Sequence, residues 1–174
     1  MSGDKNPSMV PHPSALLVRD LMTVGVLTCT SDTPLGDLAR LMLEKTAEAV
    51  AVLEDGNAVG VVDQNDLVRA YTRQDVSTLK AEDIMQEKVP EVPPDIPIIA
   101  AAQLMLDEGK RSIFLMHYSA GIGYPAAVIT YRHILRHLAA SSPDELRDLG
   151  IQAERQTPLE AFILRRDAAR RQNK

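Results

Sequence analysis

Residues 60–68 of the chain read Gly-Val-Val-Asp-Gln-Asn-Asp-Leu-Val, and residues 127–135 read Ala-Val-Ile-Thr-Tyr-Arg-His-Ile-Leu. Each stretch begins with small and β-branched residues typical of a buried strand, continues with a short polar residue, and then starts an apolar helix. We predict that a strand turns directly into a helix at both places, with polar side chains at the turn. The recurrence indicates an internal duplication, and a functional site is expected at these turns.

The segments upstream of the two turns repeat with a constant offset of 63 residues. Asp-Leu-Met at residues 20–22 recurs as Asp-Ile-Met at residues 83–85, and the apolar pattern of residues 38–43 recurs at residues 101–106. At the strand-helix turn the offset is 67, so the second copy has four additional residues between its paired strands. Two copies of this size indicate two interlocked halves, because a solenoid needs three or more stacked repeats.

The composition limits the class of protein. A chain of 174 residues with 45% apolar residues suits one compact domain, or two small domains that share a core. The formal charge of -5 gives no electrostatic basis for nucleic acid or an anionic membrane as the main partner. Cys29 is the only cysteine, so an intrachain disulfide is excluded, and no secretory signal or apolar run of membrane-spanning length is present. We therefore expect a cytoplasmic protein.

Both halves are predicted to follow the order β-α-β-β-α. The expected strands lie at residues 26–30, 50–53, 59–62, 89–92, 113–116 and 126–130, and the expected helices at residues 35–42, 65–71, 97–107 and 132–140. Residues 117–125 contain two glycines and are expected to form the most mobile ordered loop.

The chain is expected to divide into four parts: a mobile, proline-rich arm (1–14), two repeats (15–77 and 78–140) and a helical extension (141–174). The last predicted helix has three apolar residues that need a surface to cover, namely Leu159, Phe162 and Ile163.

The element order, the Asp-Leu-Met tripeptide ahead of the first strand and the Gly-Val-Val-x-x-x-Asp-Leu turn together resemble the tandem CBS domain pair, or Bateman module, over roughly residues 16–140. The resemblance implies an α+β fold in which two β-α-β-β-α repeats pack through their sheets as a pseudo-symmetric pair, with the helices outside. It also implies two clefts that often bind adenosine nucleotides or related adenosyl ligands, a regulatory role without catalysis, and a homodimer.

In this family, a hydroxyl side chain and backbone N–H groups at the turn can donate to phosphate, and a carboxylate three residues later can accept from ribose hydroxyls. The first repeat has Asp66 at the ribose position but Asp63 where the hydroxyl is expected. Glu48, just before its second strand, adds a third acid. Three carboxylates would repel phosphate, so this cleft is expected to be the weaker anion site.

The second repeat has Thr130 at the hydroxyl position and His133 in place of the ribose acid. Lys110 and Arg111 precede its second strand, a position from which the family often contacts phosphate. We predict that this cleft is the better anion site. Its adenine wall is expected from two residues of the first strand, Val26 and Leu27.

Simpler interpretations of these residues remain open. Asp66 and His133 could cap their helices, and Lys110 and Arg111 could belong to a solvated turn. His133 and His137 have the i, i+4 spacing that can present two ligands to zinc, but a third ligand is not evident nearby, so no metal site is expected.

The leading hypothesis is a stand-alone regulatory module that binds AMP, ADP, ATP or S-adenosylmethionine, requires no cofactor and acts on a regulated protein that the sequence does not identify. The alternative is a structural or dimerisation module with degenerate, empty clefts, and the broken pairing of hydroxyl and acid in each repeat favours it. Catalysis is not expected, because the sequence contains no evident nucleophile-base pair, metal set or Gly-rich phosphate loop.

Overall fold

The computed structural model describes residues 16–142 and 145–146. The predicted N-terminal arm and the apolar residues Leu159, Phe162 and Ile163 lie outside the described residues. Within the described part, no helix is long and apolar enough to cross a membrane. The elements are α1 (Val18–Leu21), β1 (Thr23–Val24), β2 (Thr28–Thr30), α2 (Leu35–Glu44), β3 (Ala49–Glu54), β4 (Asn57–Asp63), α3 (Gln64–Tyr71), α4 (Ile98–Asp107), β5 (Ser112–Ser119), β6 (Ile122–Thr130) and α5 (Tyr131–Ala139).

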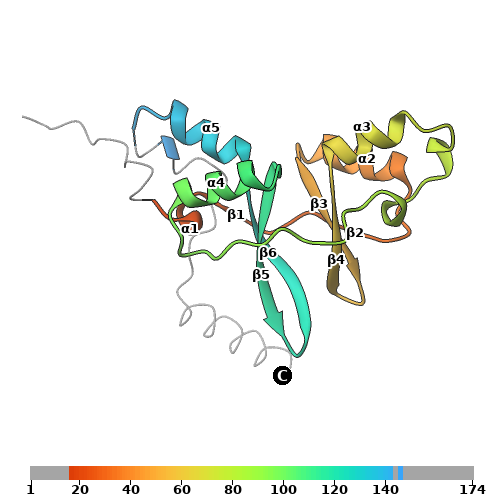
Figure 1. The fold of residues 1–174 in the computed structure, drawn as a ribbon, viewed down its shortest axis with the longest axis horizontal. Helices are drawn as coiled ribbons and strands as arrows, with labels where there is room; N and C mark the ends of the chain where they lie inside the picture. Colours follow the sequence, from red (N-terminus) through yellow and green to blue (C-terminus); the bar gives the residue numbers. More distant parts are fainter. Residues whose placement is uncertain (1–15, 143–144, 147–174) are drawn as a thin grey trace, which may run out of the picture.

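The strands form two small sheets, ordered β2-β3-β4 and β1-β6-β5 (Figure 1). Helices α2 and α3 accompany the first sheet, and α4 and α5 accompany the second (Figure 1). This arrangement confirms the predicted α+β fold of two repeats. The four predicted helices of the two repeats are also confirmed, and their observed ends differ from the expected ones by one or two residues.

One strand is exchanged between the two halves. Strand β1 precedes the first sheet in the sequence, yet it pairs antiparallel with β6, Thr23 opposite Val128. The chain then crosses to the first sheet, where β2 pairs in parallel with β3. The second half makes the equivalent crossing, because Val61 and Gln86 exchange backbone hydrogen bonds of 3.0 and 2.9 Å. The halves are therefore interlocked at both strand-helix turns.

Apolar side chains fill the space between the sheets and beneath the helices. Val61, Val89 and Phe114 form a buried cluster where the two sheets meet. On the first sheet, Leu38 and Met42 of α2 pack against buried valines of β3 and β4, in agreement with the predicted apolar face of this helix. Burial of each such side chain stabilises the fold by about 1.5–3 kcal/mol.

The predicted first strands were only partly correct. Residues 26 and 27 are not in strand β2, and residues 89–92 form a single bridge, Glu91 opposite Phe114, instead of a strand. Phe114 donates to the Pro90 carbonyl and accepts from the Val92 amide, each at 2.8 Å. Longer pairing is prevented because Pro90 and the prolines after Val92 have no N–H to donate.

The prediction of a loop over residues 117–125 was wrong. These residues continue β5 and β6 up to a two-residue turn at Ala120 and Gly121, which have φ values of 50° and 82°. The turn between β3 and β4 is similar, because Asp55 and Gly56 have φ values of 50° and 82°. Positive φ at both central residues matches the twist of a hairpin, so the four additional residues lengthen the strands.

Candidate functional site

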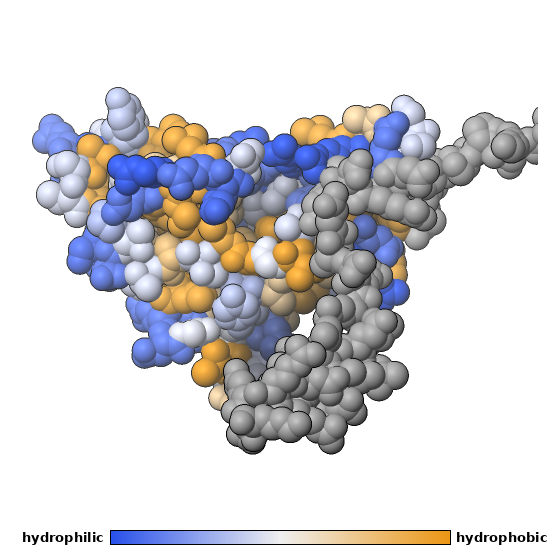
Figure 2. Space-filling view, turned by 180° about the vertical axis from the view of Figure 1, so that it is seen from behind, coloured by the Kyte–Doolittle hydropathy of each residue, from blue (hydrophilic) through white to orange (hydrophobic). Residues whose placement is uncertain are grey.

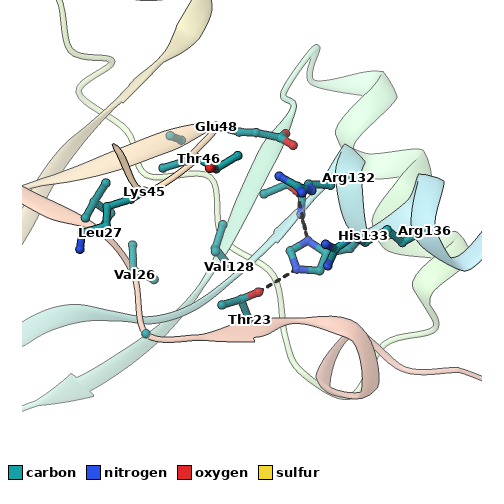
Figure 3. A pocket seen from close by; sticks show the side chains of 14 residues that line it. Thr23, Val26, Leu27, Lys45, Thr46, Glu48, Val128, Arg132, His133 and Arg136 are labelled. Atoms are coloured by element: carbon teal, nitrogen blue, oxygen red, sulfur yellow. Dashed lines mark hydrogen bonds between the residues drawn. The ribbon is translucent and has the colours of Figure 1, made fainter. Parts of the chain in front are cut away.

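A cavity of about 340 Å³ lies between the two halves, beside the first turn of α5. Three segments line it: the crossing segment after α1, residues 45–49 at the start of β3, and the turn from β6 into α5. Figure 3 shows the side chains that line this cavity. The site therefore combines one wall from the first half with another from the second half.

Part of the cavity wall is apolar. Val26 and Leu27 come from the crossing segment, and Val128 comes from β6 (Figure 3). The alanines at positions 47 and 49 also line the cavity. The prediction that Val26 and Leu27 would lie in the same cleft as Thr130 agrees with this arrangement. Such a surface suits the flat, apolar faces of an aromatic ring.

His133 caps α5 and closes one side of the cavity. Its Nδ1 accepts a hydrogen bond of 2.9 Å from the Thr130 amide, and its Nε2 lies 2.9 Å from Thr23 Oγ1. Because Nδ1 accepts, the neutral ring carries its proton on Nε2 and donates to Thr23. Burial, together with Arg136 and Arg132, lowers the pKa of His133 from an ordinary 6.5 to about 4. His133 is therefore neutral at pH 7, and the capping interpretation describes it in this structure.

The charged groups of the cavity differ from those predicted. Arg132 and Arg136 line the cavity from α5, and Lys45 lines it from the segment directly after α2. Glu48 is the one carboxylate among the described lining residues. None of these four groups forms an ion pair within residues 16–142. Figure 3 shows Glu48 and Arg132 facing each other, with Lys45 at the other end beside Leu27. The described wall therefore has more positive than negative groups.

The predicted grouping of Lys110 and Arg111 with Thr130 was wrong. Neither side chain lines this cavity, and the Arg111 guanidinium lies over the Tyr131 ring, 5.9 Å from its centroid. Glu48 occupies the position where Arg111 was expected, so the cavity is not free of acids. The interlocking of the halves brings the start of β3 to this cavity, whereas the Arg111 carbonyl accepts from the Tyr131 amide at 3.0 Å and the Arg111 side chain turns over the Tyr131 ring.

The other predicted cleft contains a hydrogen-bonded cluster. The backbone amide of each of Asp63 and Asp66 donates to the carboxylate of the other at 3.0 Å, and these two hydrogen bonds cap α3. The Gln86 amide donates to Asp66 at 2.8 Å and to Asp63 at 3.3 Å, and Lys110 Nζ contacts the Gln86 carbonyl oxygen. Burial raises the pKa of Asp66, which is only 3% exposed. Both carboxylates therefore already have partners within the protein.

Arg132 and Arg136 were not predicted from the sequence as cationic groups of this cleft, although a signal existed. Arg132 is the second residue of α5 and Arg136 lies four residues later, so both belong to one helical face beside the turn. The described residues contain no group of three or more His, Cys, Asp or Glu side chains placed to hold a metal ion.

Two interlocked repeats with a cavity at a strand-helix turn define a tandem-repeat module. A family model, described as the CBS domain, matches residues 18–73 and 81–140, which is well over half of the chain. The chain therefore belongs to the CBS domain family.

Solved structures support the same fold. The CBS domain pair of protein MJ0100, in complex with 5′-methylthioadenosine and S-adenosyl-L-methionine, is 18% identical with a TM-score of 0.62, covering 71% of this chain and 99% of that chain. An uncharacterized conserved protein from Pyrococcus horikoshii is 20% identical with a TM-score of 0.61, covering 73% and 95% of the two chains.

Among curated proteins, an uncharacterized protein of Methanocaldococcus jannaschii is 37% identical over 54 residues, which are 30% of this chain. The matched region spans 32% of that relative, about a third of its length. The solved structures are only 18% and 20% identical to this chain, so the likeness to them shows the fold alone.

Proposed function

We propose that this chain is a regulatory module that binds an adenosine nucleotide, or a related adenosyl ligand, in the cavity beside α5. The observation that carries the proposal is that one cavity joins an apolar surface to a helix start that has a guanidinium. Val26 and Leu27 form the apolar surface, with Lys45 beside Leu27, and Arg132 lies at the start of α5. An adenosine nucleotide has a matching arrangement, with an aromatic base at one end and phosphate at the other.

The phosphate end of the ligand is assigned to the start of α5. The first N–H groups of a helix and the positive end of its dipole favour an anion, and a guanidinium can hold phosphate oxygens in a bidentate manner. Arg132 is placed at this helix start and faces the cavity (Figure 3). Glu48, on the facing wall, can accept hydrogen bonds from ribose hydroxyls. The ligand would therefore extend from Val26 across Glu48 to Arg132.

The size and charge of the cavity favour a mononucleotide. Its volume of about 340 Å³ is near the lower end of the range for small-molecule sites. The cationic wall favours AMP, ADP or ATP over S-adenosylmethionine, whose sulfonium is positive. The solved MJ0100 pair, in complex with two adenosyl compounds, supports adenosyl chemistry for this fold.

A thermal-shift series with AMP, ADP, ATP, S-adenosylmethionine and NADH tests the proposal. A ligand at 100 times its Kd should stabilise the fold by about 2.7 kcal/mol, which raises Tm by several degrees for a chain of this size. Sodium triphosphate controls for unspecific anion binding, and Arg132→Ala should remove the shift. The proposal is wrong if none of the adenosyl compounds raises Tm at millimolar concentration.

The outer helical faces favour self-association as a second property. Leu43 and Tyr71 are each 81% exposed on α2 and α3, and Leu138 is 71% exposed on α5. Figure 2 shows apolar surface along this helical edge of the molecule. We propose a homodimer through these faces, since exposed apolar side chains favour association. Light scattering at micromolar concentration should give twice the monomer mass, and a Tyr71→Lys variant should shift it toward monomer.

A further inference from the structure

Thr23 and Gln86 occupy equivalent positions in the two repeats. Each is the residue after the Asp-Leu-Met or Asp-Ile-Met tripeptide. Each also pairs with the last strand of the other half, Thr23 with Val128 and Gln86 with Val61. Both side chains therefore lie at the strand-helix turn of the opposite half, so the two clefts can be compared position by position.

The side chain at this position differs in length between the clefts. Thr23 makes one side-chain hydrogen bond, to His133 Nε2 at 2.9 Å, and lines the open cavity. Gln86 is longer, and its amide reaches both Asp66 and Asp63. In the second cleft, which is the one beside Asp63 and Asp66, the single side chain of Gln86 thus bridges both polar residues of the turn.

At a second pair of equivalent positions, the side chain is again longer in the Asp66 cleft than in the cavity beside α5. Ala47 lines the open cavity, and its equivalent in the second half, 63 residues later, is Lys110. The Lys110 ammonium contacts the carbonyl oxygen of Gln86. Two long side chains therefore meet where the open cleft has threonine and alanine.

The resulting cluster leaves little capacity for a ligand. The Oδ2 atom of Asp66 accepts from the Asp63 amide at 3.0 Å and from Gln86 at 2.8 Å, while its Oδ1 lies 3.6 Å from Arg69 Nη1. A ligand that displaced Gln86 would leave a buried carboxylate without its partner, which is unfavourable. The two carboxylates also repel phosphate.

We infer that Gln86 and Lys110 act as a built-in occupant of the second cleft, so that each chain has a single adenosyl site, beside α5. Gln86 is the residue that sets this stoichiometry. The inference rests on the proposed function for the identity of the ligand, but the occupied state of the second cleft can be tested without ligand.

Calorimetric titration of the full chain with ATP and with AMP tests the stoichiometry. We expect one site per chain, a loss of affinity of at least tenfold in Arg132→Ala with no residual site, and affinity within twofold of the parent in Asp66→Asn. Two sites per chain, or one unchanged site remaining in Arg132→Ala, would overturn the inference.

A ligand-free measurement separates this inference from the proposed function. In the ¹⁵N-¹H spectrum of the full chain, the Gln86 side-chain amide, assigned by its loss in Gln86→Met, should be shifted from free glutamine and exchange slowly with solvent. It should stay in place when AMP is added. Free-glutamine shifts with rapid exchange would overturn the inference even if AMP binds, whereas a protected amide with no nucleotide binding would reject the proposed function alone.

Discussion

The turn at Asp63 and the turn at Thr130 use the same geometry with different chemistry. In one, the Asp63 amide donates to the Asp66 carboxylate at 3.0 Å, and in the other the Thr130 amide donates to His133 Nδ1 at 2.9 Å. Both side chains cap a helix, which explains why a polar residue stands at each position. Capping is therefore the shared role of these residues, and it does not by itself indicate a ligand.

The difference between the turns lies in charge. The first turn has two carboxylates that are satisfied by Gln86, whereas the second is capped by an imidazole that is neutral at pH 7. The cationic groups around the second turn therefore have no counterion at the cap. The cap leaves nearby charges unpaired on the His133 side, which is where we propose the binding site.

The largest expected effect is the response of stability to acid. The folded pKa of His133 is about 4, below the ordinary 6.5, so the unfolded chain takes up this proton first. The contribution of neutral His133 is complete above pH 6.5 and is lost as the pH falls toward 4. The total corresponds to roughly 3 kcal/mol at the known free energy per pKa unit.

Urea unfolding at several pH values measures this contribution. His133→Asn keeps an acceptor for the Thr130 amide but does not titrate, so its unfolding free energy should fall less between pH 6.5 and 4 than that of the parent. Equal slopes for the two proteins would show that His133 charges in the folded state as easily as in the unfolded state.

Asp66 should respond in the opposite direction. Because burial raises its pKa, its contribution to stability is present below the unfolded pKa and is lost as the pH rises through the folded pKa. Asp66→Asn should therefore flatten this loss, and the carbonyl of the new side chain still accepts from the Asp63 amide. A steeper loss of stability with rising pH in Asp66→Asn would contradict this assignment.

The crossing of the chain at Gly60 is expected to be the next most sensitive feature. A Cβ at this position would lie 2.7 Å from the Gln86 carbonyl oxygen and 2.8 Å from Met85 Sδ. Gly60→Ala should therefore cost about 1–3 kcal/mol of stability, the usual penalty for overpacking. The matched control is Ala127→Gly at the equivalent position, where the expected cost is about 0.5–1 kcal/mol. Thermal unfolding should rank the two variants in this order.

Much of this fold could be predicted from the sequence, because its strongest signals are local. The duplication, the capped helices and the strand-helix turns follow from periodicity and from polar residues such as Asp63 and Thr130. The placement of Val26 and Leu27 in one cavity with Thr130 was also expected. The extended hairpin at residues 117–125 was missed, since its glycines were interpreted as a loop.

The composition of the clefts could not be predicted in the same way. The pairing of β1 with β6 decides which residues of the first half lie beside the strand-helix turn of the second half. This pairing is a long-range contact that no local sequence pattern reports. Glu48 and Arg111 hold equivalent positions, but it is Glu48 that lines the cavity beside α5, so the cationic groups there are Lys45, Arg132 and Arg136 instead of the predicted Lys110 and Arg111. The error therefore arose from the topology, while the residue types had been interpreted correctly.

The arginines at equivalent positions of α3 and α5 offer a smaller test. Arg136 lines the cavity without an ion pair among the described residues, whereas Arg69 lies 3.6 Å from the Asp66 carboxylate. Arg136→Ala should weaken ATP binding by about 1 kcal/mol, or roughly fivefold, and Arg69→Ala should leave it unchanged. Calorimetry on both variants decides between them, and an equal loss would mean that the positive charge acts only at long range.

The smallest expected effect concerns the carboxylate of the cavity. Glu48 faces Arg132 and is placed to accept from ribose hydroxyls, but its charge also repels phosphate. Glu48→Gln keeps one oxygen acceptor and removes the repulsion, so the ratio of ATP affinity to adenosine affinity should rise by about threefold, or roughly 0.6 kcal/mol. Arg111→Ala is the matched control because Arg111 has the equivalent position and lies over Tyr131, outside this cavity, so the ratio should stay constant. A change in the ratio in Arg111→Ala, with none in Glu48→Gln, would contradict the placement of the nucleotide beside Glu48.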